Sequence, residues 1–376
     1  MIQFENVSKK YPNSDTEVVK NINLTIPTGQ IAVIIGPSGC GKTTCLKMIN
    51  RLIKITGGRI LIDGKDIMDY DVIKLRRSMG YVIQQTGLFP HMTVRENIEI
   101  IPTLEKRDKE KTSRRTKELM RMIGLDPEEF LDRYPTQLSG GQLQRVGVAR
   151  AFATAPDIIL MDEPFSALDP ITRGQLQDEL IFLQEKLKKT IVFVTHDMDE
   201  AIKLGNMICI LKDGEIVQYD TPEQIMKKPA TEYVREFVGR NRIWDNPEYI
   251  HAEDIMITQP LTVPGNLPAL QTLEQMRIHQ VNGAMVLNRE GVFLGFVTAL
   301  DIQRTEDKNT PVHKIARQAK VTAAPGDSIV KLLDMVNKNK TSLIPVLGGG
   351  EQLLGLITSS SLVTTLSRQY INYEEV

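Results

Sequence analysis

The sequence predicts an α/β protein with an inserted helical subdomain, followed by a repeated β-α-β-β-α unit. Three observations support this fold class. Short β-branched apolar runs alternate with longer helical patterns up to about residue 220, a polar helix-rich stretch interrupts them at about 95–150, and a repeat with a period near 60 begins at about residue 251. A chain of 376 residues has room for two or three domains.

The expected strands of the first region are short and almost wholly apolar. Each is bounded by Gly, Asp or Lys, which is typical of parallel strands buried on both faces. The helix-rich insertion separates the first two of them. The four runs are Ile31–Ile35, Ile158–Met161, Ile191–Val194 and Met207–Leu211.

The C-terminal region contains two similar copies rather than a longer array, which indicates a pseudo-twofold pair and not a solenoid. Ile255 corresponds to Ile315, Thr262 to Thr322, and the segment 295–298 to 355–358. Each copy predicts a helix followed by two strands. The helices are Leu267–Gln280 and Ser328–Lys338, and the strand pairs are 283–287 with 292–298 and 342–347 with 353–358.

The composition limits the possible functions. With 46 Lys plus Arg, 47 Asp plus Glu and a net charge of −1, the chain lacks the basic excess of a nucleic-acid binder. Its strictly apolar runs are far shorter than the roughly 20 residues that cross a bilayer, and its N-terminus has no signal-peptide core. Cys40, Cys45 and Cys209 are too few for a disulfide framework or a zinc site. We therefore expect a cytoplasmic protein.

The segment Gly36–Thr43 matches the phosphate-binding pattern G-x-x-x-x-G-K-[ST]. It follows an expected strand and opens an expected helix, Thr44–Ile53, which is the context that the pattern requires. Its backbone N–H groups would surround a phosphate, Lys42 would reach the β- and γ-phosphates, and the Thr43 hydroxyl would bind Mg²⁺. A glycine-rich turn without a ligand is the alternative. The residues expected to bind nucleotide are Gly36, Pro37, Ser38, Gly39, Cys40, Gly41, Lys42, Thr43 and Thr44.

Two carboxylates end the strand Ile158–Met161. We expect Asp162 to lie near the metal and Glu163 to polarise an attacking water. An apolar run followed by Asp-Glu is a weak signal by itself, since a solvated strand end has the same pattern. Its position downstream of the phosphate loop makes it a strong one.

A second predicted anion site begins at Ser139-Gly140-Gly141-Gln142, which opens an amphipathic helix. A helix N-terminus with free backbone N–H groups attracts phosphate. The chain already has one complete cradle, so a second, incomplete one is expected to close over the nucleotide of another subunit. A helix simply capped by Ser139 is the other interpretation.

With these motifs in order, the first 220 residues resemble the nucleotide-binding subunit of an ABC transporter. The resemblance implies that Tyr11 stacks on adenine, that Gln84 contacts Mg²⁺, that Asp169 lines a dimer interface, and that His196 contacts the γ-phosphate. Gln85, beside Gln84, is the alternative for the glutamine. The family also implies that two subunits pack head to tail, each ATP lying between the phosphate loop of one and Ser139 of the other. Glu163 and His196 would then be the catalytic residues.

The segment Leu88–Asn97 resembles the surface by which importer ATPases grip their membrane partner. Without a transmembrane run of its own, the chain would then need a separate permease. ABC proteins of DNA repair and translation are the competing class. The stretch from Lys42 to Ser139 is too short for the coiled coil of the former, and the chain has one cassette where the latter have two.

The C-terminal repeat resembles a pair of CBS modules, in which Thr298, Asp301 and Thr358 match the ribose-binding positions and Ser361 replaces the second acid. A regulatory site for cyclic di-AMP or an adenine nucleotide, and a purely structural dimer scaffold, both remain open. An ABC ATPase with this repeat resembles the subunits that power import of glycine betaine, carnitine or choline in osmoprotection. Another small solute, such as an amino acid, is the alternative.

The resulting domain prediction has four parts. They are an ATPase domain (1–220), a helical connector (221–250) and two CBS modules (251–311 and 312–370). We expect a homodimer at the cytoplasmic face of the membrane, associated with permease subunits and an extracellular or lipid-anchored solute-binding protein, and no nucleic acid. The charged stretch Lys106–Glu118 is expected to be a solvated helix face, with contact to lipid headgroups as the alternative.

Overall fold

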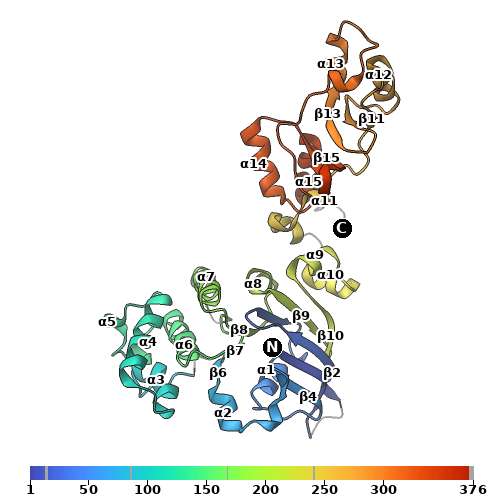
Figure 1. The fold of residues 1–376 in the computed structure, drawn as a ribbon. Helices are drawn as coiled ribbons and strands as arrows, with labels where there is room; N and C mark the ends of the chain where they lie inside the picture. Colours follow the sequence, from blue (N-terminus) through green and yellow to red (C-terminus); the bar gives the residue numbers. More distant parts are fainter. Residues whose placement is uncertain (13–15, 85–86, 167, 240–241, 372–376) are drawn as a thin grey trace. The chain divides into compact units, whose positions relative to one another are not determined.

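The computed structural model describes residues 1–376 except 13–15, 85–86, 167, 240–241 and 372–376. The chain forms two compact units, Met1–Val238 and Gly239–Val376, and each is described here by itself (Figure 1). Among the described residues, no helix combines the length and the apolar character needed to cross a membrane.

A six-stranded sheet forms the centre of the first unit, in the order β10-β9-β3-β8-β7-β6. All pairs are parallel except β10 with β9. Every residue of β3, β7 and β8 is buried, which confirms the interpretation of the apolar runs as interior parallel strands. The strands are β3 (Ile31–Ile35), β6 (Met79–Val82), β7 (Ile158–Asp162), β8 (Thr190–Thr195), β9 (Met207–Lys212) and β10 (Glu215–Asp220).

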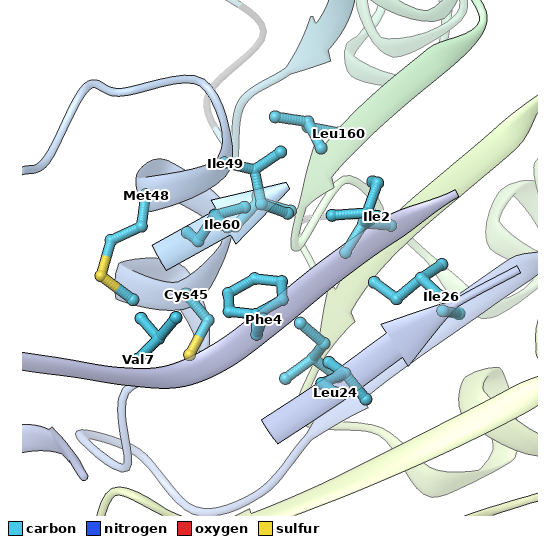
Figure 2. Packing of buried hydrophobic residues seen from close by; sticks show 14 of the residues in the cluster. Ile2, Phe4, Val7, Leu24, Ile26, Cys45, Met48, Ile49, Ile60 and Leu160 are labelled. Atoms are coloured by element: carbon cyan, nitrogen blue, oxygen red, sulfur yellow. The ribbon is translucent and has the colours of Figure 1, made fainter. Parts of the chain in front are cut away.

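A second, antiparallel sheet in the order β2-β1-β4-β5 was not predicted from the sequence. Its apolar face and that of the central sheet enclose helix α1 (Lys42–Ile49) in one core, where Phe4, Cys45, Ile60 and Leu160 lie together (Figure 2). The phosphate loop therefore rests on a rigid base. The strands are β1 (Ile2–Lys10), β2 (Glu17–Ile26), β4 (Gly57–Ile62) and β5 (Lys65–Asp66).

The predicted helical insertion is present between β6 and β7. Its helices contact one another around buried Leu119, Met120 and Val146. Within the stretch Lys106–Glu118, Thr116 is buried while most of the charged side chains are exposed or half-buried, as a solvated helix face requires. The helices are α3 (Val94–Leu104), α4 (Lys109–Met122), α5 (Pro127–Phe130) and α6 (Gly140–Phe152).

The remaining helices of the first unit connect the strands or follow the last of them. Helices α9 and α10 belong to this unit, although the sequence placed them in a connector. The bounds are α2 (Val72–Arg77), α7 (Pro170–Leu187), α8 (Met198–Leu204), α9 (Pro222–Lys227) and α10 (Glu232–Val238).

The second unit contains the two predicted copies, each with its own small core. The first has β11 (Thr262–Pro264), α12 (Ala269–Ile278), β12 (Gly283–Leu287), β13 (Phe293–Thr298) and α13 (Ala299–Arg304). The second has α14 (Ile329–Asn339), β14 (Leu343–Leu347), β15 (Leu353–Thr358) and α15 (Ser359–Ile371). The predicted helices and strand pairs agree with these bounds to within a few residues.

The two copies exchange their lead-in segments. The lead-in segments are the residues of each copy that precede β11 and α14. Ile257, in the lead-in of the first copy, bridges to Leu356 of the second, and Arg317, in the lead-in of the second, bridges to Phe296 of the first. Ala252 of α11 (Ala252–Ile255) lies in the core of the second copy, while Val312 lies in the core of the first. The exchange makes the pair one structural body and has the pseudo-twofold pattern expected from the repeat.

Candidate functional site

The phosphate loop follows β3 and leads into α1, which begins two residues earlier than predicted. The helix ends at Ile49 rather than Ile53, because Arg51 adopts the left-handed conformation (φ 55°). Gly41 has φ 104°, and a Cβ at this position would lie 2.8 Å from the carbonyl oxygen of Val18. A glycine is therefore required there. The loop borders a hollow of about 290 Å³ lined by Val18, Ser38, Gly39, Gly41, Lys42, Thr43, Thr44 and Glu163.

Lys42 is buried against the loop from which it comes. Its Nζ donates hydrogen bonds to the carbonyl oxygens of Gly36 (2.8 Å) and Pro37 (2.9 Å). An ammonium group has three N–H donors, so the third remains for an anion in the hollow. The arrangement suits a phosphate whose other oxygens meet the N–H groups of the loop.

Thr43 and Asp162 meet under the hollow, from α1 and from the end of β7. The Thr43 hydroxyl donates to Asp162 Oδ1 at 2.7 Å, and Lys47 Nζ lies 3.9 Å from the other carboxylate oxygen. Hard oxygen ligands of this kind, one hydroxyl and one carboxylate, fit Mg²⁺, which takes its remaining ligands from phosphate and water. Two of the three predicted metal ligands are therefore adjacent, and Lys47 is a neighbour that the sequence analysis missed.

Glu163 lies at the centre of a second cluster. Its Oε2 accepts a hydrogen bond from Gln84 Nε2 (3.1 Å) and lies 3.3 Å from His196 Nδ1. Glu163 has φ 44°, and its N–H donates to Val194 O of the neighbouring strand, so the backbone turns its side chain toward the hollow. The three predicted residues thus meet at the ends of β6, β7 and β8, although Gln84 contacts Glu163 and not Asp162. Gln85 lies outside the described residues.

Ser139 and Asp169 line a separate hollow of about 490 Å³, together with Gly140, Gly141 and Gln142. Ser139 Oγ accepts from Gln142 N (3.3 Å), and Gln142 Oε1 accepts from Ser139 N (2.9 Å), which is a capping box at the start of α6. Asp169 caps α7, and the hydrogen bonds from Thr172 lower its pKa. None of these residues lines the hollow of the phosphate loop, so the two predicted anion sites are distinct within one chain.

Tyr11 and Cys40 flank the phosphate loop. The Tyr11 hydroxyl lies 3.4 Å from Thr44 Oγ1, and Lys9 Nζ lies 5.0 Å from the centre of the Tyr11 ring. Cys40 is buried, and burial raises the pKa of its thiol, an effect that Lys42 partly opposes. Tyr11 therefore lies beside the phosphate loop. Its stacking on adenine, and a role for the backbone of Cys40 in binding phosphate, stay predictions.

A single buried asparagine shapes the segment Leu88–Asn97. The Asn97 side chain donates to the carbonyl oxygens of Phe89, Met92 and Thr93 and accepts from Phe89 N. Phe89 remains 41% exposed, with its ring edge-on to His91. Asn97 holds the loop so that an aromatic side chain faces outward. The sequence analysis did not single out this asparagine, because its four hydrogen bonds, to Phe89, Met92 and Thr93, depend on its burial in the folded protein.

The CBS-like sites of the two copies differ in charge. Thr298 Oγ1 donates to Asp301 Oδ2 (2.7 Å), and Arg317, from the lead-in segment of the second copy, donates to Asp301 Oδ1. In the second copy, Ser361 Oγ accepts from Thr358 N (3.0 Å), and no acid stands at that position. The predicted Thr298–Asp301 pair is thus in place, and Arg317 is a charged neighbour that the sequence analysis missed.

A parallel sheet whose strand ends carry a phosphate loop, a Thr–Asp pair and a Gln–Glu–His cluster defines a P-loop ATPase. Comparison with known families is consistent with this class. The ABC transporter model matches residues 19–166, and the CBS domain model matches 252–306 and 312–368. The chain belongs to the ATP-binding proteins of ABC transporters that carry a pair of CBS domains.

Three relatives are similar over nearly the whole chain. The choline transport ATP-binding protein OpuBA of Bacillus subtilis is 46% identical, with 96% of this chain and 95% of the relative covered. The glycine betaine/carnitine/choline transport ATP-binding protein OpuCA of the same organism is 47% identical, with the same coverage. The osmoprotectant import ATP-binding protein OsmV of Salmonella typhimurium is 40% identical, with all of both chains covered.

Among solved structures, the first unit resembles the ABC transporter cassette MJ0796. Its dimeric structure is 40% identical, with a TM-score of 0.54, and covers 59% of this chain and 99% of that chain. A post-hydrolysis state of MJ0796 bound to ADP and Pi gives the same values. The fold class and the ATPase class predicted from the sequence are confirmed by these matches.

Proposed function

We propose that this protein hydrolyses ATP to power a separate membrane permease that imports a quaternary-ammonium compatible solute. One observation carries the hydrolytic part. Glu163, Gln84 and His196 converge at the edge of the hollow formed by the phosphate loop. The full-length similarity to choline, carnitine and betaine transport ATP-binding proteins supports the solute class.

Binding of ATP would use the phosphate loop and its surroundings. Backbone N–H groups of 36–44 would surround the phosphates, the free donor of Lys42 would meet the β- and γ-phosphates, and Tyr11 would stack on adenine. Thr43 and Asp162 would hold Mg²⁺, with Gln84 as a third ligand if its amide turns from Glu163. When bound, Mg²⁺ neutralises charge on the phosphate oxygens.

Hydrolysis would depend on Glu163 as the group that orients and polarises water. Its carboxylate is 19% exposed, accepts from Gln84 and lies beside His196, so its orientation is fixed while one face remains open. His196 is 61% exposed and is free to contact the γ-phosphate. Phosphoryl transfer of this kind relies on positioning and charge stabilisation, not on a covalent enzyme intermediate.

A head-to-tail homodimer would complete the site. The hollow of Ser139 and Asp169 is separate from that of Lys42, which supports closure of each over the nucleotide of the other subunit. The dimeric form of the MJ0796 cassette supports the same assembly.

The permease would dock on the segment Leu88–Asn97, where Phe89 is exposed. The protein would then associate peripherally with the cytoplasmic face of the membrane, in a complex that also contains an extracellular or lipid-anchored solute-binding protein. Glycine betaine, carnitine and choline are the expected solutes, with an amino acid as the alternative, because the ATPase does not touch the solute. Co-purification with the permease, followed by uptake of each labelled solute, distinguishes them.

The CBS pair would regulate transport through a ligand such as cyclic di-AMP or an adenine nucleotide. The Thr298–Asp301 pair supports a ribose-binding role, whereas Ser361 in the second copy favours a structural scaffold. Calorimetry of the protein with cyclic di-AMP and AMP separates the two, since a scaffold binds neither.

The test of the hydrolytic proposal is Glu163→Gln. The variant keeps the shape of the side chain and should bind ATP with wild-type affinity while its turnover falls at least about a hundredfold, because an amide cannot act as the base. Binding is measured with a fluorescent ATP analogue and turnover by phosphate release. Lys42→Ala is the control that should lose binding. Wild-type turnover in Glu163→Gln would remove Glu163 from this role.

A further inference from the structure

Arg173 lies in the first turn of α7, between two loops that carry site residues. Its Nη2 donates to the carbonyl oxygen of Leu168 (3.1 Å), and its Nη1 donates to Asp197 Oδ2 (3.3 Å). Leu168 directly precedes Asp169, and Asp197 directly follows His196. One guanidinium group therefore joins the loop at the predicted dimer face to the loop that carries the predicted switch histidine.

Asp197 anchors the backbone beside His196. Its N–H donates to Thr195 Oγ1 (3.0 Å), and its Oδ1 accepts from the N–H groups of Asp199 (2.8 Å) and Glu200 (3.4 Å) at the start of α8. The His196 side chain itself is mostly exposed and makes one contact with Glu163. The position of the His196 side chain thus depends on the backbone that Asp197 anchors, and Asp197 in turn accepts a hydrogen bond from Arg173.

The guanidinium group also has an N–H donor, at Nε, that these two hydrogen bonds do not use. Arg173 Nε is buried and has no hydrogen-bond partner in the part of the chain that the structure describes. It lies 4.0 Å from Glu200 Oε1, whose carboxylate accepts from Thr195 Oγ1 (2.6 Å) and Gln177 Nε2 (3.3 Å). An unsatisfied buried donor is costly, so a small shift of Arg173 toward Glu200 gains a bond. The hydrogen bonds around Arg173 can therefore adopt a second arrangement, in which Nε donates to Glu200.

We propose that Arg173 is a positioning residue that couples the Leu168–Asp169 loop to His196. The proposal rests on the proposed ATPase function. When a second subunit contacts the loop of Asp169, displacement of Leu168 is passed through the guanidinium group to Asp197 and so to His196 beside Glu163. An arginine is needed because its planar fork spans two acceptors, which a lysine ammonium on one flexible stem does not.

The first measurement compares Arg173→Gln with Lys203→Met in the full-length chain. Lys203 Nζ joins the same two helices through Gly174 O (3.3 Å) and Asp178 Oδ1 (2.8 Å), but it touches neither loop. We expect kcat of Arg173→Gln to fall about tenfold or more while KM for ATP stays within about twofold, since Arg173 touches no residue of the phosphate loop. Lys203→Met should keep kcat within about twofold. Arg173→Lys, which keeps the charge, should also lose most of the activity.

A double-mutant cycle separates positioning from plain structural support. If Arg173 acts through His196, adding Arg173→Gln to His196→Ala leaves the residual kcat unchanged, whereas an equal further fall in that background contradicts the proposal. In the nucleotide-free protein, the imidazole NMR resonances of His196 should shift in Arg173→Gln but not in Lys203→Met. This readout does not need activity. A wild-type protein without ATPase activity would contradict the proposed function but not the role of Arg173. Unshifted His196 resonances or an unchanged kcat in Arg173→Gln would overturn the role of Arg173.

Discussion

At the scale of single residues, the three cysteines belong to the core that supports the phosphate loop, and Cys40 is itself part of the loop. Cys40, Cys45 and Cys209 are all buried and free, and they belong to one apolar cluster. Burial raises the pKa of Cys45 to about 12, and it also raises the pKa of Cys209 well above the usual value of a thiol. Three pKa units reduce the thiolate fraction about a thousandfold. Because the thiolate is the nucleophile, we expect these buried thiols to react slowly in the folded protein.

The prediction is that the native protein reacts with a thiol reagent such as DTNB at pH 8 much more slowly than the urea-unfolded chain. The expected ratio of rates is at least about a hundredfold for each thiol, since both burial and the raised pKa oppose reaction. Single Cys→Ser variants assign the rates. A thiol that reacts equally fast in both states would show that it is exposed in the native protein.

The residues that could be predicted are those whose chemistry is encoded locally. Lys42, Asp162 and Glu163 stand in short patterns next to a strand, so their meeting followed from the parallel sheet. Arg173 and Arg317 could not be predicted, because their partners come from loops distant in the chain or from the exchanged segments. Asn97 was hidden for a different reason. Its side chain can hold the loop because it is buried, and the residues around it in the sequence do not show that it is buried.

At the scale of elements, the loop before α3 depends on the side chain of Asn97. We predict that Asn97→Ala abolishes co-purification with the permease while ATP turnover of the isolated protein stays within about twofold. The substitution removes four hydrogen bonds, including the one that the Phe89 N–H donates to the Asn97 side chain, at a cost of about 2–3 kcal/mol to the conformation of the loop.

Its matched control is Asn339→Ala, which removes a half-buried asparagine whose side chain donates to Met335 O at the end of α14. This variant should bind the permease normally. Retention of the complex by Asn97→Ala would show that the loop is not the docking surface.

Helices and strands could be predicted where all their residues are equally buried, and they were missed or misplaced where burial varies along the element. The central strands were recognised because all their residues are buried and each contains an uninterrupted apolar run. Strand β1 escaped detection, since register shifts between Phe4 and Val7 and between Val7 and Lys9 break the alternation of its side chains. The end of α1 was wrong by four residues because its apolar pattern continues to Ile53, while the left-handed Arg51 ends the helix.

At the scale of the whole molecule, the two units have separate cores. We predict two transitions in calorimetric unfolding, and we expect ATP to shift only the one that belongs to Met1–Val238. At a hundredfold excess of ATP over its Kd, linkage stabilises that unit by about 2.7 kcal/mol. The Glu163→Gln variant avoids consumption of the nucleotide during the scan.

Lys42→Ala provides the control, since it should show both transitions without the shift. A single transition that moves as a whole with ATP would show that the units unfold cooperatively, contrary to the division of the chain.

The exchange of lead-in segments also sets the order in which the C-terminal unit is completed during synthesis. Ala252 leaves the ribosome first but has no core to join until the strands of the second copy follow. The strands of the first copy emerge before Val312, which belongs to their core. Neither copy therefore finishes folding as its own residues appear. The nascent unit must hold an exposed apolar lead-in segment until nearly the last strand is made, which makes this interval its period of greatest exposure to chaperones and aggregation.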